Sequence, residues 1–367
     1  MTKQAEVAAD PKYVTVLDHG FVGVVDTMGT DASIVQAARV SYGDGTKTVL
    51  EDRGLIRYLM RHKHTSPFEM CQIKLHIKMP IFVMRQWVRH RTASLNEYSG
   101  RYSVMTDEFY LPEPEVIQPQ SKDNKQGRAG TLGVTNTTGV RWMMDAAYRH
   151  SYDIYEALLG EGRENPDLIY DPYDPDDALF DDEFGGIARE MARSVLPVGN
   201  YTELYWTQNL HNMMHLLKLR LDPHAQYEIR VFAQAVYDLI QPIYPEALQA
   251  FDDYIREATS NSRMETSVLK MLLSSDAPAR VAFAGALMSA GGDKAFAELH
   301  ELSLRELRDF TDKWGLPTFK QAPAVLSSID NPETPGVPNK VKAKRKATAK
   351  KPPAPPPRPP KPTKVFD

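Results

Sequence analysis

The spacing of hydrophobic residues predicts strands near the N-terminus and helices further along the chain. Residues 71–79, CQIKLHIKM, alternate between apolar and polar side chains, which is typical of a strand with one buried face. Residues 13–29 indicate two more strands around a turn at 18–20. Apolar residues at helical spacing predict helices in the segments 31–41, 50–64, 80–91, 186–197, 201–221, 222–240 and 255–317. Strands that precede helices, without a repeated strand–helix–strand unit, favour an α+β fold.

Prolines set the expected ends of several helices. Pro67 follows the 50–64 helix and is expected to prevent its continuation. Pro80 and Pro223 suit the first turns of the helices that they begin, and Asp222 is a plausible cap for the second of these. On the 80–91 helix, Gln86 lies on the face that leads into the polar segment after it.

Length and composition describe an ordinary globular chain. Its 367 residues can bury a large core and form more than one domain, and 42% of them are hydrophobic and 25% charged. No apolar run approaches the length of a membrane span, and the N-terminal residues lack the apolar block of a secretory signal. We therefore expect a cytoplasmic protein.

The single cysteine, Cys71, excludes disulfides within the chain and sites that need several cysteines. It lies in the alternating strand pattern beside apolar neighbours, so burial in the core is the expected role. A thiol nucleophile at this position is the alternative.

Charge is divided unevenly and marks domain boundaries. From Lys340 onward the tail carries a net charge of +9, although the whole chain has −4, so the rest is strongly acidic. Residues 158–184 contain ten Asp or Glu and suggest a solvated insertion, with a carboxylate metal site as the alternative. The tail is rich in Lys and Pro and cannot form a core. We expect a catalytic domain at 1–254, a helical extension at 255–330 and a disordered tail at 331–367.

The segment RHRTASLNEYSGR, residues 89–101, concentrates groups that bind phosphate. The chain has no GxxxxGK[ST] loop, no GxGxxG after a strand and no HExxH. Phosphates would then be bound by guanidinium groups such as Arg89, Arg91 and Arg101, which can hold an oxyanion with two hydrogen bonds. A solvated basic turn is the alternative, because the same segment is rich in turn residues.

These residues resemble a known family. The segment matches RHRxxSxNExSxR, the signature of flavin-dependent thymidylate synthases, at every fixed position. The segments VLDHGFVGVVDTMG, AARVSYG, HTSPFE, DNKQG, ARSVLP and YWTQNLHNMMHLLKLRLDPHAQYEIR are also similar to that family. The resemblance covers most of residues 13–240. It implies a curved, largely antiparallel sheet with flanking helices.

The resemblance implies a methyltransferase that converts dUMP to dTMP. Methylenetetrahydrofolate would supply the carbon, and NADPH would supply reducing equivalents through FAD. No cysteine nucleophile is required, because the chemistry belongs to the flavin and the protein provides position and charge. The family also implies a homotetramer with FAD sites built from several subunits.

The roles of the family's motif positions are assigned to this chain residue by residue, wherever the residues match. The resemblance implies nucleotide binding by Gln86, Arg89, Glu97, Ser99, Gly100, Arg101, Arg193 and Arg220. It gives Arg220 the catalytic role, in which a guanidinium beside the pyrimidine stabilises negative charge on N3 or O4. Ser99 is a nucleophile by residue type, but no base for it is evident, so we assign it to binding.

The implied FAD positions lie in several separate segments. They are Ser41, His64, Ser66, Glu69, Arg89, His90, Arg91, Thr92, Glu97, Asn209, His211, His215, Leu219 and His224. His211 and His215 are four residues apart, a spacing that can also bind zinc, with His224 as a third ligand. Flavin contacts, a metal site and ordinary structural histidines stay open for this group.

Two other functions stay open. A related enzyme could hydroxymethylate a pyrimidine nucleotide on the same scaffold, and nothing in the sequence separates the two products. The basic tail could instead bind nucleic acid weakly and with strong salt dependence. Its single aromatic residue, Phe366, gives little support to base stacking, so a solvated tail is favoured.

Overall fold

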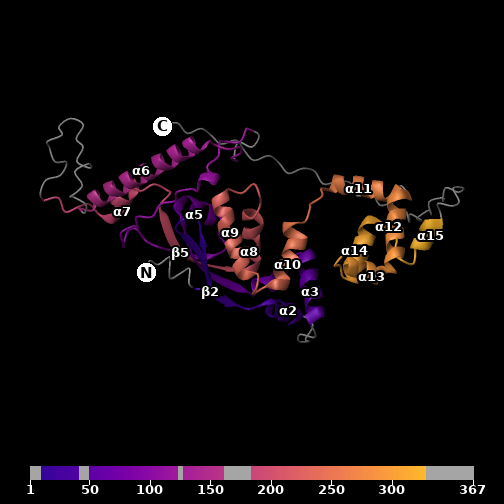
Figure 1. Cartoon of the computed structure of the whole chain (residues 1–367). Coiled ribbons are helices and arrows are strands. Elements are labelled where there is room, and N and C mark those ends of the chain that lie inside the picture. The colour runs from indigo at the N-terminus through magenta and orange to yellow at the C-terminus, as the bar shows by residue number, and fades with distance from the viewer. Residues whose placement is uncertain (1–9, 41–48, 123–126, 161–182, 276, 328–367) are drawn as a thin grey trace, which may run out of the picture. The chain divides into compact units, whose positions relative to one another are not determined.

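The computed structural model describes residues 10–40, 49–122, 127–160, 183–275 and 277–327 (Figure 1). Ser41, most of the acidic insertion and the basic tail lie outside these residues, so the expectations for them stay predictions. The chain divides into two compact units, Met1–Ser260 and Asn261–Asp367. The functional boundaries expected at 254 and 330 also remain predictions. No helix in the described part of the chain is long and apolar enough to cross a membrane.

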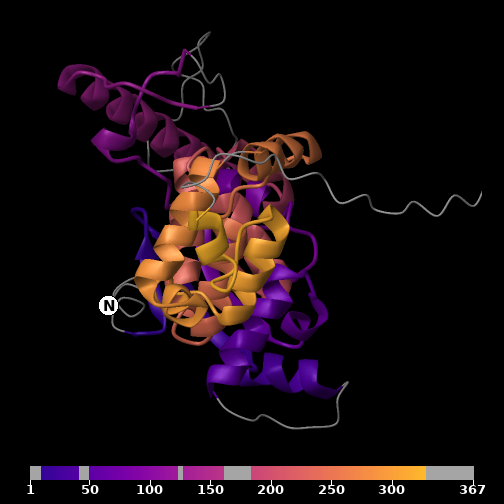
Figure 2. The ribbon, with the colours of Figure 1, turned by 90° about the vertical axis from the view of Figure 1, so that its right-hand side faces the viewer.

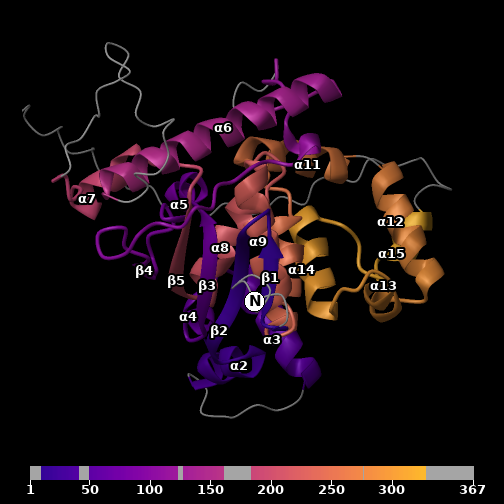
Figure 3. The same cartoon turned by 60° about the vertical axis from the view of Figure 1, so that its left-hand side comes forward.

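The first unit is built on one antiparallel sheet with the strand order β1-β2-β3-β5-β4. The strands are β1 (Tyr13–Val16), β2 (Gly20–Met28), β3 (Gln72–Pro80), β4 (Ser94–Glu97) and β5 (Tyr201–Asn209). Figure 3 shows them side by side, with α8 and α9 along one face. The α+β class with an antiparallel sheet is confirmed.

Helices cover the sheet and enclose its core. In the first unit they are α2 (Asp31–Arg39), α3 (Val49–Arg61), α4 (Ser66–Glu69), α5 (Ile81–Trp87), η2 (Pro114–Val116), α6 (Val134–Leu158), α7 (Arg189–Ala192), η4 (Arg193–Val195), α8 (Leu210–Arg220), α9 (Tyr227–Ile240), α10 (Pro245–Phe251) and η5 (Asp252–Arg256). Fully buried Trp87, Phe232 and Phe251 join the strands to these helices in one hydrophobic core. α9 packs on β1 and β2, and α8 packs on β5.

The prediction of a strand at 71–79 is confirmed, but its polar face is exposed only at Lys74 and is buried further along the strand. Ile73 and Ile77 are fully buried on one face, and His76 and Lys78 are also buried on the other. Both polar side chains have partners, because His76 Nε2 lies 2.7 Å from Glu203 Oε1 and Lys78 Nζ donates to Glu108 Oε2 at 2.6 Å. Alternation therefore identified a central strand whose second face is covered at His76 and Lys78 but not at Lys74.

The prediction of one continuous helix over 201–221 is wrong. Residues 201–209 form β5, which lies between β3 and β4, and the helix begins only at Leu210. Thr202 and Gln208 lie on the buried face of this strand beside Leu204 and Trp206. Two polar residues in a buried row hid the period of two from the sequence pattern.

Other helix boundaries also differ from the prediction. Pro67 lies in the first turn of the short helix α4, where its missing N–H costs nothing. α5 ends at Trp87, so His90 lies beyond the helix. α9 begins at Tyr227, which places Asp222 and Pro223 in the preceding turn. The long helix α6 was not predicted.

Cys71 is fully buried, and its thiol lies 3.7 Å from the carbonyl oxygen of Thr30. Burial raises the pKa of the thiol to about 11, and Asp31 adds to this effect. The expected core role is confirmed.

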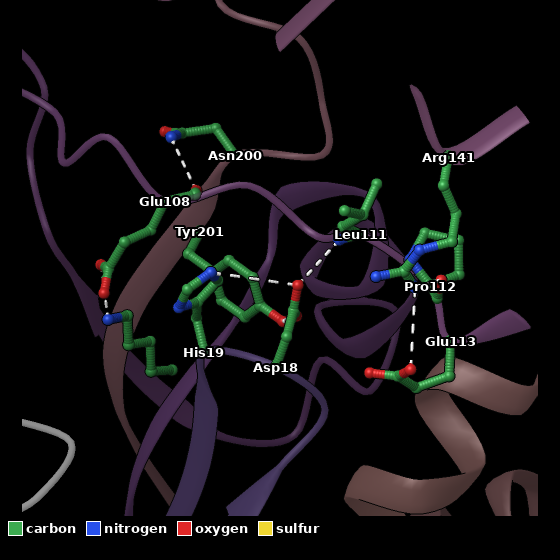
Figure 4. A network of polar contacts seen from close by, with 10 residues as sticks. Asp18, His19, Glu108, Leu111, Pro112, Glu113, Arg141, Asn200 and Tyr201 are labelled. Atoms are coloured by element: carbon green, nitrogen blue, oxygen red, sulfur yellow. Dashed lines mark hydrogen bonds and ion pairs between the residues drawn. The ribbon is translucent and has the colours of Figure 1, made fainter. Parts of the chain in front are cut away.

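A polar network fixes the loop after the signature segment to the sheet (Figure 4). Asp18 accepts a hydrogen bond from the Tyr201 hydroxyl at 2.6 Å and another from the backbone N–H of Leu111 at 2.8 Å. Asn200 Nδ2 donates to the carbonyl oxygen of Glu108 at 3.1 Å. Burial next to Asp18 raises the pKa of Tyr201, so the phenol stays a donor.

The second unit is a small helical domain with its own core. It contains α11 (Arg263–Ser275), α12 (Ala277–Ala290), α13 (Asp293–Leu299), α14 (Leu304–Trp314) and α15 (Ala322–Ser327), drawn in orange and yellow in Figure 2. Leu287, Phe296 and Leu307 are central to its core. Ser303 caps α14, and Gly315 ends it at φ 68°, which a residue without Cβ adopts freely. The helical content expected here is confirmed.

Candidate functional site

Strand β5 holds the signature segment, residues 89–101, against the sheet. Within the segment, β4 pairs with β5, and Gln208 Nε2 donates to the carbonyl oxygen of Thr92 at 3.1 Å. Thr202 Oγ1 donates to Glu97 Oε1 at 2.7 Å. The polar residues on the buried face of β5 therefore bind the segment that carries the signature.

Arg220, at the end of α8, reaches back to the start of this segment. Its Nε donates to His90 Nε2 at 3.0 Å, and its Nη2 lies 3.4 Å from the carbonyl oxygen of Gln86. Burial lowers the pKa of Arg220, and the nearby Arg89 adds to this effect, but a guanidinium stays charged in proteins. The half-buried cation is thus held in one orientation by groups 130 and 134 positions away in sequence.

His90 is suited to accept this hydrogen bond because it is neutral. Burial lowers its pKa to about 4, and Arg220 and His215 contribute. The rings of His90 and His215 meet edge to face at 6.1 Å. We call Arg220, His90, His215 and Gln86 the Arg220 cluster.

Gln86 has a further partner that sequence reasoning missed. Its Nε2 donates at 2.6 Å to Oε1 of Gln226, the residue just before α9. The bond orients the amide of Gln86, which the resemblance assigns to the nucleotide. Because the two residues are 140 positions apart, no local pattern pointed to this contact.

Gly100, Arg101 and Arg193 form a second group, which we call the Arg101 region. A Cβ on Gly100 would lie 3.1 Å from Arg193 Cδ and 2.9 Å from Met105 Sδ, so glycine permits this close packing. Arg101 Nε pairs with Glu190 Oε2 at 3.0 Å, and both side chains are more than half exposed. Ser99 Oγ accepts a weak hydrogen bond from the backbone N–H of Arg101 at 3.3 Å. The structure therefore brings together three of the predicted nucleotide residues and adds Glu190.

His64, His211 and His215 line one cavity of about 400 Å³, which we call the histidine cavity. Its buried lining residues, which we call its floor, are apolar and include Phe68 and Phe251, whereas the exposed His64 and His215 belong to its rim. A cavity of this size with an apolar floor and polar rim is suited to part of a ring-bearing cofactor. Since His215 also contacts His90, the cavity adjoins the Arg220 cluster.

The remaining predicted flavin positions lie apart from this cavity. Ser66 lines a different cavity beside Pro67 and Met70, and Asn209 caps α8 by accepting from the N–H of Asn212. Glu69 does not line the histidine cavity, but it accepts a hydrogen bond at 3.0 Å from Oγ1 of Thr65, which does. Four more of these positions are exposed on the surface: Arg89, Arg91, Thr92 and Leu219. One copy of the chain does not gather all these residues.

His224 also lies elsewhere, on a cavity of about 720 Å³ that Arg128 and Arg230 help to line. It is strongly exposed and pairs with Asp222 at 2.9 Å. His224 is thus on a different cavity from His211 and His215, so these three do not form the zinc site that their spacing allowed. Among the described residues no group of three or more His, Cys, Asp or Glu could hold a metal ion.

Comparison with known proteins gives consistent matches. The family described as "Thymidylate synthase complementing protein" matches residues 23–246. A "Flavin-dependent thymidylate synthase" of Rickettsia bellii is 48% identical over 272 residues, 74% of this chain and 88% of that protein. The protein of the same name from Ruegeria pomeroyi is 46% identical over 301 residues, 82% of this chain and 87% of that protein.

A solved structure is also similar. It is the UMP/dUMP methylase PolB from Streptomyces cacaoi bound with 5-Br dUMP, with a TM-score of 0.54 and 31% sequence identity. The match covers 66% of this chain and 99% of that chain.

Proposed function

Because this chain belongs to the thymidylate synthase complementing protein family, whose relatives include flavin-dependent thymidylate synthases, we propose that it methylates dUMP to dTMP. The protein is a methyltransferase with a flavin cofactor, FAD. Methylenetetrahydrofolate is the carbon donor in this proposal, and NADPH is the reductant. The observation that carries the site assignment is the Arg220 cluster, where a neutral imidazole orients a half-buried guanidinium.

In the proposed mechanism Arg220 contacts the edge of the uracil ring. A fixed positive charge there stabilises negative charge on N3 or O4 and makes C5 more nucleophilic. His90 restrains the rotation of the guanidinium, and Gln226 holds Gln86 toward the nucleotide. Arg101 and Arg193 bind the 5′-phosphate, which replaces the Glu190 carboxylate at Arg101.

The described residues fit part of FAD. The histidine cavity has the size, apolar floor and polar rim that a ring-bearing nucleotide requires, and it adjoins the Arg220 cluster. When bound, FAD would supply the reducing equivalents, drawn from NADPH, that turn the methylene group into a methyl group. His64, His211 and His215 are the residues of this chain that would hold it.

We further propose that neighbouring copies complete the site in a homotetramer. The proposed nucleotide and flavin residues lie on separate surfaces of one chain, and several are exposed, including Arg91, Arg101 and His224. Surfaces from other copies would bring these groups to one ligand. Sedimentation of the protein with and without FAD tests this part of the proposal.

The test of the reaction is product mass. The purified chain is incubated with FAD, NADPH, methylenetetrahydrofolate and dUMP, and the nucleotide product is weighed. dTMP is the expected product, and a hydroxymethylated nucleotide would instead indicate the related enzyme. An unchanged dUMP, together with a colourless protein that cannot be reconstituted with FAD, would contradict the proposal.

A truncation separates catalysis from the tail. We propose that residues 1–254 are the catalytic domain, so a chain that ends before Asn331 should keep its turnover. Loss of nucleic-acid binding without loss of turnover would assign the basic tail a separate role.

A further inference from the structure

The rim of the histidine cavity carries cations that the family resemblance does not assign. Besides its histidines, the cavity is lined by three cations: Arg61 at the end of α3, Lys63 just after it, and Lys218 in the last turn of α8. Among the described residues that line it there is no Asp or Glu. Neither lysine has an acidic partner in the described part of the chain. A cavity with cations on its rim and no acid favours an anionic ligand.

Lys218 shares one face of α8 with the cavity histidines. His211, Met214, His215 and Lys218 follow the spacing that places residues on one side of a helix, and all four line the cavity. α8 therefore presents a continuous row to the cavity, which begins at His211, includes the His90 contact at His215 and ends at the ammonium group of Lys218.

Lys63 occupies a backbone position that favours glycine. α3 ends with two turn hydrogen bonds, from the N–H of His64 to the carbonyl oxygen of Leu59 and from the N–H of Lys63 to that of Met60. This pattern requires a left-handed residue after the helix, and Lys63 has φ 58°. A lysine is strained there and glycine would not be, and such strain is typical of functional sites.

We propose that Lys63 and Lys218 bind the phosphate groups of a dinucleotide whose ring end lies toward the Arg220 cluster. The inference rests on the proposed function, which supplies two dinucleotides of this chemistry, FAD and NADPH. The apolar floor accepts a flat ring, and the two ammonium groups stand at the rim where a charged diphosphate remains partly solvated. The phosphate of either dinucleotide meets the same chemical requirement.

The experiment measures binding rather than turnover. Equilibrium dialysis with riboflavin, FMN, FAD and NADPH compares the full-length chain with Lys63→Gly, Lys218→Met and the double variant. The matched control is Lys12→Ala, which removes an exposed lysine that does not line this cavity. We expect the double variant to bind FAD at least about tenfold more weakly, while riboflavin, which has no phosphate, is unaffected.

Lys63→Gly provides an internal check on folding. Because glycine relieves the left-handed strain, this variant should melt at the same temperature as the parent or higher, yet bind more weakly. Weaker FAD binding with a lower melting temperature would overturn the assignment of Lys63, because it would indicate structural damage.

The outcomes of this experiment distinguish FAD from NADPH as the ligand, and they distinguish the lysine assignment from the proposed reaction. If NADPH binding alone weakens, the assignment holds with the reductant as the ligand. If the double variant binds both dinucleotides as the control does, or if the parent chain binds no phosphorylated ligand, the inference is overturned. A parent chain that binds FAD through these lysines but makes no dTMP would contradict the proposed reaction and leave this inference supported.

Discussion

The Arg220 cluster and the Arg101 region serve the same proposed nucleotide, but the chain holds them in different ways. Arg220 is half-buried and hydrogen-bonded to a neutral imidazole and a backbone carbonyl. Arg101 is more than half exposed and pairs with the exposed carboxylate of Glu190. The residue for ring chemistry is thus oriented before binding, whereas the residue for the phosphate is left to respond to its ligand. Preorganised charge is worth most where charge develops during reaction.

The largest effect is expected from Arg220→Ala. Loss of the oriented charge should lower kcat about 100- to 1,000-fold, because that charge acts on the transition state. Flavin absorbance should persist. Steady-state turnover of dUMP measures the effect, and Arg220→Lys is the companion variant that keeps charge without the planar fork. Normal turnover in Arg220→Ala would show that this residue has no part in the mechanism. The contrast between the Arg220 cluster and the Arg101 region would then have no functional meaning.

Arg101→Ala should act on affinity instead. Loss of a charge-assisted hydrogen bond to phosphate should weaken dUMP binding by about 1.5–3 kcal/mol, which is roughly 10- to 150-fold. Titration of the flavin-loaded protein with dUMP measures it. The control is Arg149→Ala, since Arg149 is an exposed arginine on α6 paired with Asp145. Unchanged affinity in Arg101→Ala would mean that the phosphate binds elsewhere.

The buried His90 of the Arg220 cluster should make the stability of the folded chain depend on pH below neutrality. His90 has a folded-state pKa of about 4, below its ordinary value of 6.5, so the unfolded chain binds the proton more readily. The corresponding stability is complete above pH 6.5 and is lost as pH falls toward 4. Between pH 7 and 5 the melting temperature should fall roughly 2–4 °C more than in His90→Gln, which does not titrate. Parallel melting curves for both proteins would show that His90 is not held neutral.

Glu190→Gln should have the smallest effect. Exposed ion pairs contribute about 0.2–1 kcal/mol, so removing the carboxylate that occupies Arg101 should tighten dUMP binding no more than about fivefold. The gain should shrink at high salt, because the pair is solvent-exposed. Binding measurements at two ionic strengths test this. Weaker binding would indicate that Glu190 positions Arg101 for the phosphate.

Sequence patterns predicted elements well where one local period dominates. β3 and the helical content of residues 255–317 follow from spacing alone, but the ends of the individual helices there, and α15, were not predicted. β5 was missed because its buried row includes Thr202 and Gln208, which are polar but hydrogen-bonded to the signature segment. A buried polar residue with a distant partner looks the same in sequence as an exposed one.

The site shows the same limit. The signature motif predicts nucleotide-binding residues, and the structure places one of them, Gly100, against Arg193 from a distant segment. The partners that orient them are far apart in sequence, as Gln226 is from Gln86 and Glu190 from Arg101. These contacts exist only after the chain has folded. The left-handed backbone at Lys63 likewise has no signal in residue type, because the sequence shows a lysine where glycine is the usual choice.

The buried thiol of Cys71 bears on which compounds can inactivate this protein. With a pKa of about 11, only on the order of one molecule in 10,000 carries the reactive anion at pH 7, and the sulfur is shielded from solvent. Compounds that alkylate cysteine thiols therefore find no accessible cysteine on the folded chain.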